Sequence, residues 1–387
     1  MRRRVANSGP VVVVSFTGNS GLTDYSASFC REVAKTDEVV LLTAESIDPF
    51  FRGMGFPVEA IFRRSRHYPV DVLRFLRRIV ALQPRVVLFQ GPLKFPLVDA
   101  LAVRYLRRRG VPVAAVVHDV VPHNERAIST AALHAYYRAF PCLIAHSEDA
   151  ADRLRVAGIR ASTMVVPHGR YDIFDIDSLS RADARSSLGI DGDAVVALFF
   201  GNLEERKGLG EFVAAAEKDA GATALFLAAG KDFLSASAPR SLKETIRNER
   251  VVEGLRVDSG RVPHRQVQFY FRAADVVVLP YREGSTSGVL KLAFAFGVPV
   301  LATDVGDIRE QLTEGLGQVI NGEATPDAIV AGVAELAGRA RLQNVDVSLE
   351  WSDIAPRVMS FLRRPDSGSV EVVQSTKAHP LPPRDEG

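Results

Sequence analysis

The stretch with the clearest potential for chemistry is PYREGSTSGVLKLAFAFGVPV, residues 280–300, where a charged cluster leads through small polar residues into an apolar helix. The backbone amides of Gly288 and of the residues just after it would be unsatisfied donors at the positive end of the helix dipole. Such a helix start can bind an anion. An ordinary capped helix, with Ser285, Thr286 or Ser287 as N-cap, explains the same residues. On this stretch alone, both interpretations stand.

A second cluster, FFGNLEERKGLGEFVAAA at residues 199–216, brings two cations to the end of a predicted strand. Gly201 ends the strand, and a polar loop then delivers Arg206 and Lys207 just before Gly208 and an amphipathic helix. Two adjacent cations at this place could neutralise a diphosphate without a metal. A solvated loop with a glycine at the start of the helix is the alternative.

A glycine-containing loop, TGNSGLTD at residues 17–24, follows the first predicted strand. Gly18 and Gly21 would let the backbone approach a phosphate or a sugar, and a plain strand-to-helix turn explains them equally well. The loop is not GxGxxG, and the chain has no GxxxxGK[ST] or GxSxG motif. A dinucleotide dehydrogenase, a P-loop kinase and an α/β-hydrolase are therefore disfavoured.

Histidines follow two other predicted strands. In VVHDVVPH, residues 116–123, His118 could donate to a substrate oxygen or act as an acid or base, and a structural pair with Asp119 is the alternative. His123 would suggest a metal, but no third and fourth ligand follows at helical spacing, so we predict no metal site. His168 lies at the candidate domain junction, where a hinge is as good an explanation as a site.

The elements that must position these residues are short β-branched runs alternating with helix-length spacers, a pattern that predicts parallel sheets buried on both faces. Two sets of runs suggest two doubly wound sheets, joined near residues 170–190. In such sheets ligands bind beyond the carboxyl ends of the strands, where nearly all the polar segments above are found. The runs are 11–16, 38–44, 85–91, 113–119, 142–147 and 162–169, then 194–202, 223–230, 274–281 and 298–306.

Composition fits a globular protein of two domains: 387 residues, 47% apolar and 24% charged. Only two cysteines, Cys30 and Cys142, are present, which favours a reducing compartment. The apolar run near the start is too short for a signal peptide, and no stretch approaches a membrane span, so we expect a cytoplasmic protein.

The net charge of +2 is unevenly distributed along the chain, because residues 1–110 carry 18 Lys/Arg and 9 Asp/Glu. The two halves are expected to have different tasks.

Taken together, FFGNLEERKG and LPYREGSTSGVLKLAFAFGVPVLATDVGDIRE resemble the retaining family 4 glycosyltransferases of the GT-B fold, and the domain order extends the resemblance over most of the chain. It implies two Rossmann-like domains, each a doubly wound parallel sheet, facing a central cleft. The expected parts are an acceptor domain at 1–170, a linker at 171–190, a donor-nucleotide domain at 191–347, a helix crossing back to the first domain at 348–364 and a disordered tail at 365–387.

By this resemblance, Lys207 binds the diphosphate of the donor and Glu283 contacts the hydroxyls of the donor sugar. The amides of Gly288 and Val289 would hold the diphosphate on the helix that Ser287 precedes. The helix mouth would then be a pyrophosphate site.

The first domain also contributes to the expected site. By resemblance, His118 lies beside the transferred sugar, and the loop from Gly18 to Gly21 closes over it.

Two departures from the family pattern concern the nucleotide. A second glutamate often lies eight residues after the first, and this chain has Lys291 there. An arginine usually precedes the lysine of the phosphate site, where this chain has Asn202 and Glu204. Asn202 and Arg206 are our candidate donor-binding residues in that loop, with Arg206 as a substitute for the missing arginine. The nucleobase and the contacts to the ribose stay open.

The resulting hypothesis is a metal-independent, cofactor-free hexosyltransferase that moves a sugar from a nucleoside-diphosphate sugar to the hydroxyl of a sugar or lipid-linked acceptor. The expected context is polysaccharide, glycolipid or glycoconjugate biosynthesis. Lys207, Arg206 and the helix after Ser287 would stabilise the leaving diphosphate. The resemblance implies retention of anomeric configuration, with front-face attack. Alternatives are a sugar-nucleotide epimerase of the same fold and a non-catalytic sugar-nucleotide-binding protein.

A basic amphipathic stretch, FRRSRHYPVDVLRFLRRIVALQPR at residues 62–85, lies in the expected acceptor domain. Such a stretch can lie on an anionic membrane surface, near a lipid-linked acceptor. A solvated helix face is the alternative. Nucleic acid is a poorer partner, because no recognised binding motif accompanies the charge. The expected location is the cytoplasm, and attachment to the inner face of the membrane stays open as one of the two interpretations of this stretch.

Overall fold

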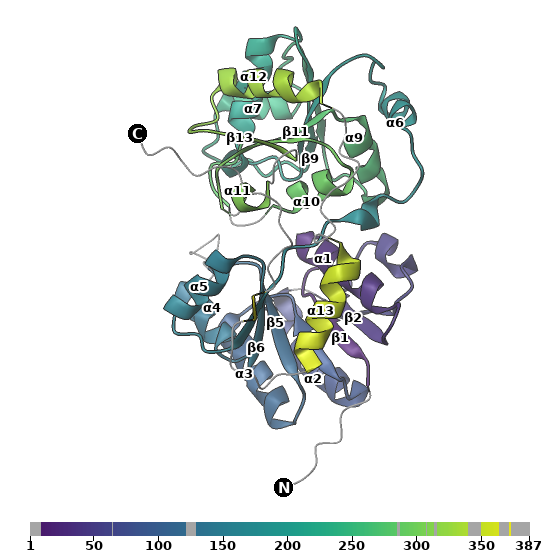
Figure 1. Ribbon diagram of the computed structural model, residues 1–387, viewed down its shortest axis with the longest axis vertical. Coiled ribbons are helices and arrows are strands. Elements are labelled where there is room, and N and C mark those ends of the chain that lie inside the picture. The colour runs from purple at the N-terminus through teal and green to yellow at the C-terminus, as the bar shows by residue number, and fades with distance from the viewer. Residues whose placement is uncertain are drawn as a thin grey trace. The chain divides into compact units, whose positions relative to one another are not determined.

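The computed structural model describes residues 9–63, 65–120, 129–284, 287–306, 308–312, 316–339, 350–363 and 371–372 (Figure 1). The chain divides into two compact units. Unit 1 takes in residues 1–169 and 348–376, and unit 2 takes in residues 170–347 and 377–387. Each unit is built around its own parallel sheet.

The sheet of unit 1 has eight parallel strands in the order β14-β7-β6-β5-β4-β1-β2-β3. Its central strands are buried along their whole length, which explains why they consist almost entirely of apolar residues. The strands are β1 (Val11–Val14), β2 (Val39–Ala44), β3 (Val58–Phe62), β4 (Val86–Phe89), β5 (Val113–Val117), β6 (Cys142–Ala145), β7 (Ser162–Val165) and β14 (Glu371–Val372).

Helices cover both faces of this sheet. Because parallel crossovers are right-handed and the strand order reverses between β1 and β4, the helix after β1 lies on the opposite face from the helix after β4. Accordingly α1 packs against α13, whereas α3 packs against α2 and α4 (Figure 1). The helices are α1 (Gly21–Val33), α2 (Tyr68–Leu82), α3 (Pro96–Arg108), α4 (Thr130–Tyr137), α5 (Glu148–Val156) and α13 (Trp351–Arg363), with short 3-10 turns η1 (Pro49–Gly53) and η2 (Ser65–His67).

The sheet of unit 2 has six parallel strands in the order β10-β9-β8-β11-β12-β13, and its order reverses between β8 and β11. Helices α7 and α12 pack together over one face, and their apolar residues share a core with the strands. The strands are β8 (Val196–Phe200), β9 (Leu225–Gly230), β10 (Leu255–Ser259), β11 (Val276–Leu279), β12 (Val300–Thr303) and β13 (Gly317–Ile320). The helices are α6 (Arg181–Leu188), α7 (Leu209–Asp219), α8 (Arg240–Ile246), α9 (Val267–Ala273), α10 (Gly288–Ala295), α11 (Ile308–Gln311) and α12 (Pro326–Ala337), with 3-10 turns η3 (Asp172–Phe174), η4 (Glu205–Lys207) and η5 (His264–Gln266).

The segment expected to be a linker, 171–190, contains η3 and α6, and α6 packs against α9 inside unit 2. Arg185 of α6 is buried and donates to the Asp275 carboxylate at 2.7 Å. The segment expected to be a disordered tail, 365–387, contributes two described residues, which form β14 beside β7.

Both sheets therefore have a switch point, where the strand order reverses and the loops on either side diverge. It lies between β1 and β4 in unit 1 and between β8 and β11 in unit 2. Ligands of open parallel sheets bind at the carboxyl ends of the strands at such points. The candidate site residues of each unit follow strands at the carboxyl edge of its sheet.

Candidate functional site

The loop after β8 packs directly on the chain that leaves β11, and a glycine makes this possible. Gly208 has φ +72, and a Cβ placed on it would lie 1.8 Å from the carbonyl oxygen of Pro280. An L-residue with a side chain is disfavoured there by both conformation and space. The backbone N–H of Arg282 donates to the carbonyl oxygen of Arg206 at 2.9 Å, which ties the two segments together. The turn thereby fixes where the neighbouring Lys207 lies.

Lys207 is held inside the edge of the sheet. Its side chain is 14% exposed, and its Nζ lies 3.7 Å from a carboxylate oxygen of Glu204 and 5.9 Å from the centre of the Tyr281 ring. Burial lowers the pKa of Lys207 to about 8, although the Glu204 carboxylate opposes this shift. Gly201, at the end of β8, leaves space beside the ammonium: a Cβ built there would lie 3.4 Å from Nζ. A buried ammonium beside a glycine, where no side chain blocks the approach of a ligand, suits an anionic ligand.

The start of α10 also faces Gly201. The buried hydroxyl of Ser287 is the N-cap, accepting from the Leu290 N–H at 3.2 Å, so the capped-helix interpretation is confirmed for this residue. This cap leaves the N–H groups of Gly288 and Val289 without intrahelical acceptors. A methyl carbon of Val289 lies 3.5 Å from the Cβ position of Gly201, which places the helix start next to Lys207. The cap and an anion site are thus compatible.

The other predicted donor-binding residues of unit 2 are more exposed. Arg206 is about one-third exposed and donates to Glu204 at 2.8 Å, whereas Asn202 and Glu283 are exposed in the loops after β8 and β11. The structure thus brings Lys207 and the start of α10 together and leaves Asn202 and Glu283 on the surface of the same edge. Ser285 and Thr286 lie outside the described residues.

Lys291 points into the protein from α10. It is fully buried, its ammonium donates to the side-chain oxygen of Gln311, and it lies 5.4 Å from the centre of the Phe294 ring. The position at which the family pattern has a second glutamate is therefore part of the packing between α10 and α11.

In unit 1, His118 lies directly after β5 and is fixed by two neighbours. Its Nε2 is 3.1 Å from the side-chain oxygen of Gln90, which follows β4, and its ring meets Tyr25 edge-on at 5.1 Å. Desolvation by these surroundings lowers the pKa of His118 to about 4, against a smaller opposite effect of Asp119. At neutral pH the imidazole is uncharged and can exchange hydrogen bonds with a ligand hydroxyl.

This lowered pKa predicts that His118 stays neutral from about pH 5 to pH 8. The unfolded chain, with an ordinary histidine pKa near 6.5, then binds a proton that the folded chain does not. We expect the contribution of His118 to stability to decline as the pH falls from about 6.5 towards 4. An NMR titration of the imidazole C–H signals checks this, and a His118 midpoint above pH 6 would contradict the prediction.

Three side chains that the sequence analysis did not assign to a site complete this edge. His146 follows β6, and its ring lies 5.5 Å from that of His118 and 5.2 Å from that of Tyr25. Trp351 of α13 meets Tyr25 at 4.9 Å. His168 also contacts Tyr25, at 5.0 Å, so it belongs to this aromatic cluster. A systematic look at the first residue after each strand would have found Gln90, His118 and His146 together.

In the loop at residues 17–24, the packing of the chain explains why Gly18 is a glycine. A Cβ on Gly18 would lie 2.6 Å from the backbone nitrogen of Ile47, so the loop packs on the segment after β2. Gly21 begins α1.

His123 lies outside the described residues, and among those described no group of three or more His, Cys, Asp or Glu is arranged to hold a metal ion.

Family models match both units. Residues 19–170 match the model described as Glycosyltransferase Family 4, and residues 194–339 match that described as Glycosyl transferases group 1. A D-inositol 3-phosphate glycosyltransferase of Nocardia farcinica is 32% identical over 187 residues, which are 47% of this chain and 41% of the relative. The chain spans from 41% to 68% of the length of the first curated relatives that it matches.

Solved structures match over nearly the whole chain. Sucrose-phosphate synthase from Thermosynechococcus elongatus has a TM-score of 0.72 at 18% identity, covering 92% of this chain and 98% of that one. HepE from Anabaena, solved with UDP-glucose, has a TM-score of 0.66 at 16% identity, covering 92% and 97%. A UDP-GlcNAc 2-epimerase from Neisseria meningitidis, bound to UDP-GlcNAc, has a TM-score of 0.61 at 13% identity, covering 92% and 99%.

These likenesses establish the GT-B fold class, two Rossmann-like units with parallel sheets. The two family matches make the chain similar to the family 4 glycosyltransferases over residues 19–170 and to the glycosyltransferases of group 1 over residues 194–339.

Proposed function

We propose that this enzyme transfers a hexose, with retention of anomeric configuration, from a nucleoside-diphosphate sugar to an acceptor hydroxyl in glycoconjugate biosynthesis. The observation that carries this proposal is the buried Lys207 ammonium, which lies beside the start of α10. There the N–H groups of Gly288 and Val289 have no acceptor within the helix. A diphosphate is the ligand whose charge and size fit a cation next to a helix N-terminus. That HepE was solved with UDP-glucose supports UDP as the first nucleotide to test.

In this proposal unit 2 holds the nucleotide and stabilises the leaving group. As the anomeric bond breaks, negative charge grows on the diphosphate, and Lys207, Arg206 and the amides of Gly288 and Val289 are fixed donors for it. Glu283 would bind the sugar hydroxyls, and Asn202 would contact the donor from the same edge. No group on this list forms a covalent bond to the sugar.

Unit 1 would bind the acceptor, with a neutral His118 hydrogen-bonded to the transferred sugar and the loop from Gly18 to Gly21 beside it. Retention would follow from attack by the acceptor hydroxyl on the face that the diphosphate leaves. A sugar or lipid-linked acceptor fits this scheme. None of the described helices is both long enough and apolar enough to span a membrane.

Product analysis tests the proposal directly. Purified full-length protein is incubated with UDP-, GDP- and dTDP-sugars, with and without a membrane lipid extract. Release of a nucleoside diphosphate that increases with the extract supports transfer, and the anomeric proton coupling of the product distinguishes retention from inversion. Conversion of the donor without diphosphate release would instead support an epimerase, the activity named for one structural neighbour. Binding of a donor without any conversion would support a non-catalytic binding protein.

The lowered pKa of Lys207 makes a separate prediction about nucleotide affinity. With its pKa at about 8, Lys207 loses its charge between pH 7 and pH 9, whereas Arg206 keeps its own. If the neutral amine does not hold the diphosphate, the Kd of UDP should rise about tenfold between these two pH values. Titration calorimetry checks this, and buffers of different ionisation enthalpy should reveal proton uptake on binding near pH 8.

The matched control is Lys207→Gln, which should bind UDP weakly at both pH values with no such rise. A Kd of the unmodified protein that does not change from pH 7 to pH 9 would contradict a role for Lys207 in holding the diphosphate.

A further inference from the structure

The outer faces of α2 and α3 carry an apolar groove. Leu73 and Leu101 are 54% and 61% exposed, although both are leucines on helices that also supply core residues. The groove has a volume of about 670 Å³. Its apolar lining is formed by Val72, Leu73, Leu76, Val80, Ala81, Val98, Leu101, Ala102 and Tyr105. Isolated exposed leucines are common, but a continuous apolar lining over two neighbouring helices is typical of a binding surface.

The exposed charges on the two helices that carry this groove have one sign. Residues 63–110 contain twelve Lys/Arg and two Asp/Glu. Both acids are fully buried: Asp71 accepts from the Arg63 guanidinium at 2.9 Å, and Asp99 accepts from the Tyr68 hydroxyl. The exposed charges on α2 and α3, which the structure describes in full, are therefore all arginines.

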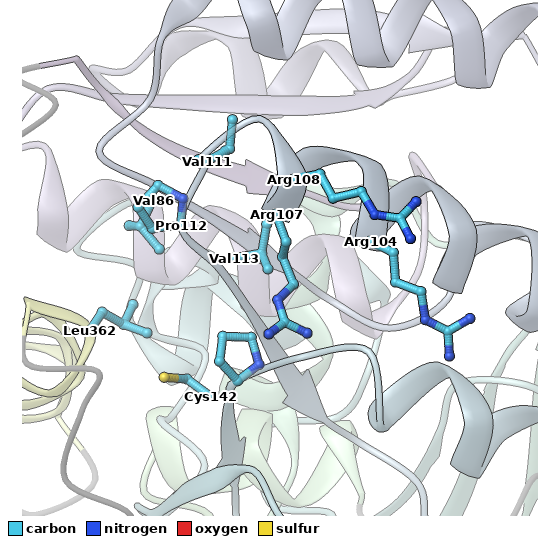
Figure 2. Close-up of a pocket in the computed structure, with 11 residues that line it drawn as sticks. Val86, Arg104, Arg107, Arg108, Val111, Pro112, Val113, Cys142 and Leu362 are labelled. Carbon is cyan, nitrogen blue, oxygen red and sulfur yellow. The ribbon is translucent and has the colours of Figure 1, made fainter. Parts of the chain in front are cut away.

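Three of these arginines line a second cavity at the C-terminal end of α3. Figure 2 shows Arg104, Arg107 and Arg108 projecting from the last turns of the helix. The cavity has a volume of about 520 Å³, and its remaining lining is mostly backbone and apolar side chains at the amino ends of β4, β5 and β6. Because Arg104 and Tyr105 are consecutive, the basic cavity and the apolar groove open on adjacent parts of the same helix.

We propose that the outer face of α2 and α3 is a docking surface for an anionic lipid bilayer. The groove residues would enter the boundary between headgroups and acyl chains, while Arg77, Arg104, Arg107 and Arg108 would contact lipid phosphates. Apolar and aromatic side chains flanked only by cations form the pattern that binds such an interface. A bilayer suits this face better than a protein partner because every exposed charge on α2 and α3 is a cation, which matches the uniform negative charge of an anionic lipid surface.

The position of this face in the fold suits a lipid-linked acceptor, a point that rests on the proposed function. Helices α2 and α3 follow β3 and β4, so both begin at the carboxyl edge of the sheet, where Gln90 and His118 lie. The exposed apolar residues Leu97 and Leu101 occupy the first half of α3, and the three arginines of the cavity occupy its second half. Docking of the apolar part would bring the catalytic edge of unit 1 close to the lipid headgroups.

Vesicle co-sedimentation of the full-length protein tests the docking surface without any assumption about catalysis. The probes are vesicles of phosphatidylcholine alone and of phosphatidylcholine with 30% phosphatidylglycerol. We expect binding only to the anionic vesicles. Each of Arg77→Ala and Arg104→Ala should lower the partition coefficient about fivefold, and Leu73→Glu with Leu101→Glu should abolish binding.

Matched controls lie on α5 of the same unit. Val156→Glu changes a residue that is 90% exposed, and Arg153→Ala removes an exposed arginine, so both should leave vesicle binding unchanged. The fluorescence of Trp351, which lies in the same unit, and the unfolding midpoint of each variant show whether the fold is retained. The single arginine variants decide the result should the double glutamate variant fail to fold. Equal binding to both kinds of vesicle, or α5 variants as weak as the α2 and α3 variants, would overturn the proposal. Failure of sugar transfer with intact vesicle binding would instead count against the proposed function alone.

Discussion

Replacing Lys207 with alanine is expected to lower turnover of the sugar donor by about 10²-fold or more, because a fixed donor to the leaving group is lost. The ammonium is the most buried cation at the edge of β8 and β11 among the described residues of the two loops there, and burial strengthens its interaction with a phosphate. Arg206 lies next to it but is more exposed and already bonded to Glu204, so it should compensate only in part. Initial rates of nucleoside diphosphate release, measured with saturating donor, check this.

The control for this experiment is a lysine of the same unit that lies outside the site, on the helix that begins just after Lys207. Lys218 lies at the other end of α7, is half exposed and pairs with Asp327, so Lys218→Ala should leave turnover unchanged. Lys207→Arg keeps the charge but brings a larger, planar group into a closely packed turn, and we expect an intermediate rate. Near-normal turnover of Lys207→Ala with correctly folded protein would rule out leaving-group stabilisation by this residue.

The central strands of both sheets were predictable from the sequence, whereas the four edge strands, β3, β10, β13 and β14, were not. Strands such as β1 and β11 are buried on both faces, so they appear as uninterrupted apolar runs. Strands β3, β10 and β13 lie at the edges of their sheets and are partly exposed. Their sequences, VEAIF, LRVDS and GQVI, contain polar residues where solvent reaches them. Without the burial signal, short segments of this kind resemble loops.

In the candidate site, too, residues in a local sequence pattern could be predicted, whereas contacts between distant parts of the chain could not. Lys207 and Ser287 stand out because each lies beside a glycine at the start of a helix, a pattern visible within ten residues of sequence. The contact of Tyr25 with Trp351 joins residues more than 300 positions apart, and no local pattern encodes it. The role of Gly18 was also ambiguous, because a glycine that admits a ligand and one that admits another part of the chain look alike until Ile47 is placed beside it.

Helix α6 illustrates why the segment 171–190 was expected to be only a linker. Its sequence is polar, and its main tertiary anchor is the charged side chain of Arg185, which sequence patterns assign to the surface. In the structure that guanidinium is 2% exposed and donates to the backbone oxygens of Ala273 and Asp191 as well as to Asp275. A buried arginine with several acceptors can hold a helix in place as firmly as an apolar contact.

Removing the partner of this arginine should be the most destabilising change that we predict. Asp275→Ala is expected to lower the free energy of unfolding of unit 2 by about 3–5 kcal/mol, because it leaves the buried Arg185 charge uncompensated. The same carboxylate accepts from the Val196 N–H at 2.9 Å, so the start of β8 loses a hydrogen bond as well. Urea unfolding with hydrogen exchange read out on peptides that cover β8 and α6 measures the effect and locates it.

The control is an ion pair of the same chemical type on the surface of the same unit. Asp175 accepts from Arg272 with both side chains about 30% exposed, so Asp175→Ala should cost about 1 kcal/mol or less. Trp351, the single tryptophan of the chain, lies in unit 1 and reports separately on that unit by fluorescence. If Asp275→Ala changed the stability of unit 2 no more than Asp175→Ala does, α6 would have to be held by its apolar contacts alone. The double replacement Arg185→Met with Asp275→Leu should then be tested against each single change, because a buried ion pair removed as a whole costs less than one broken in half.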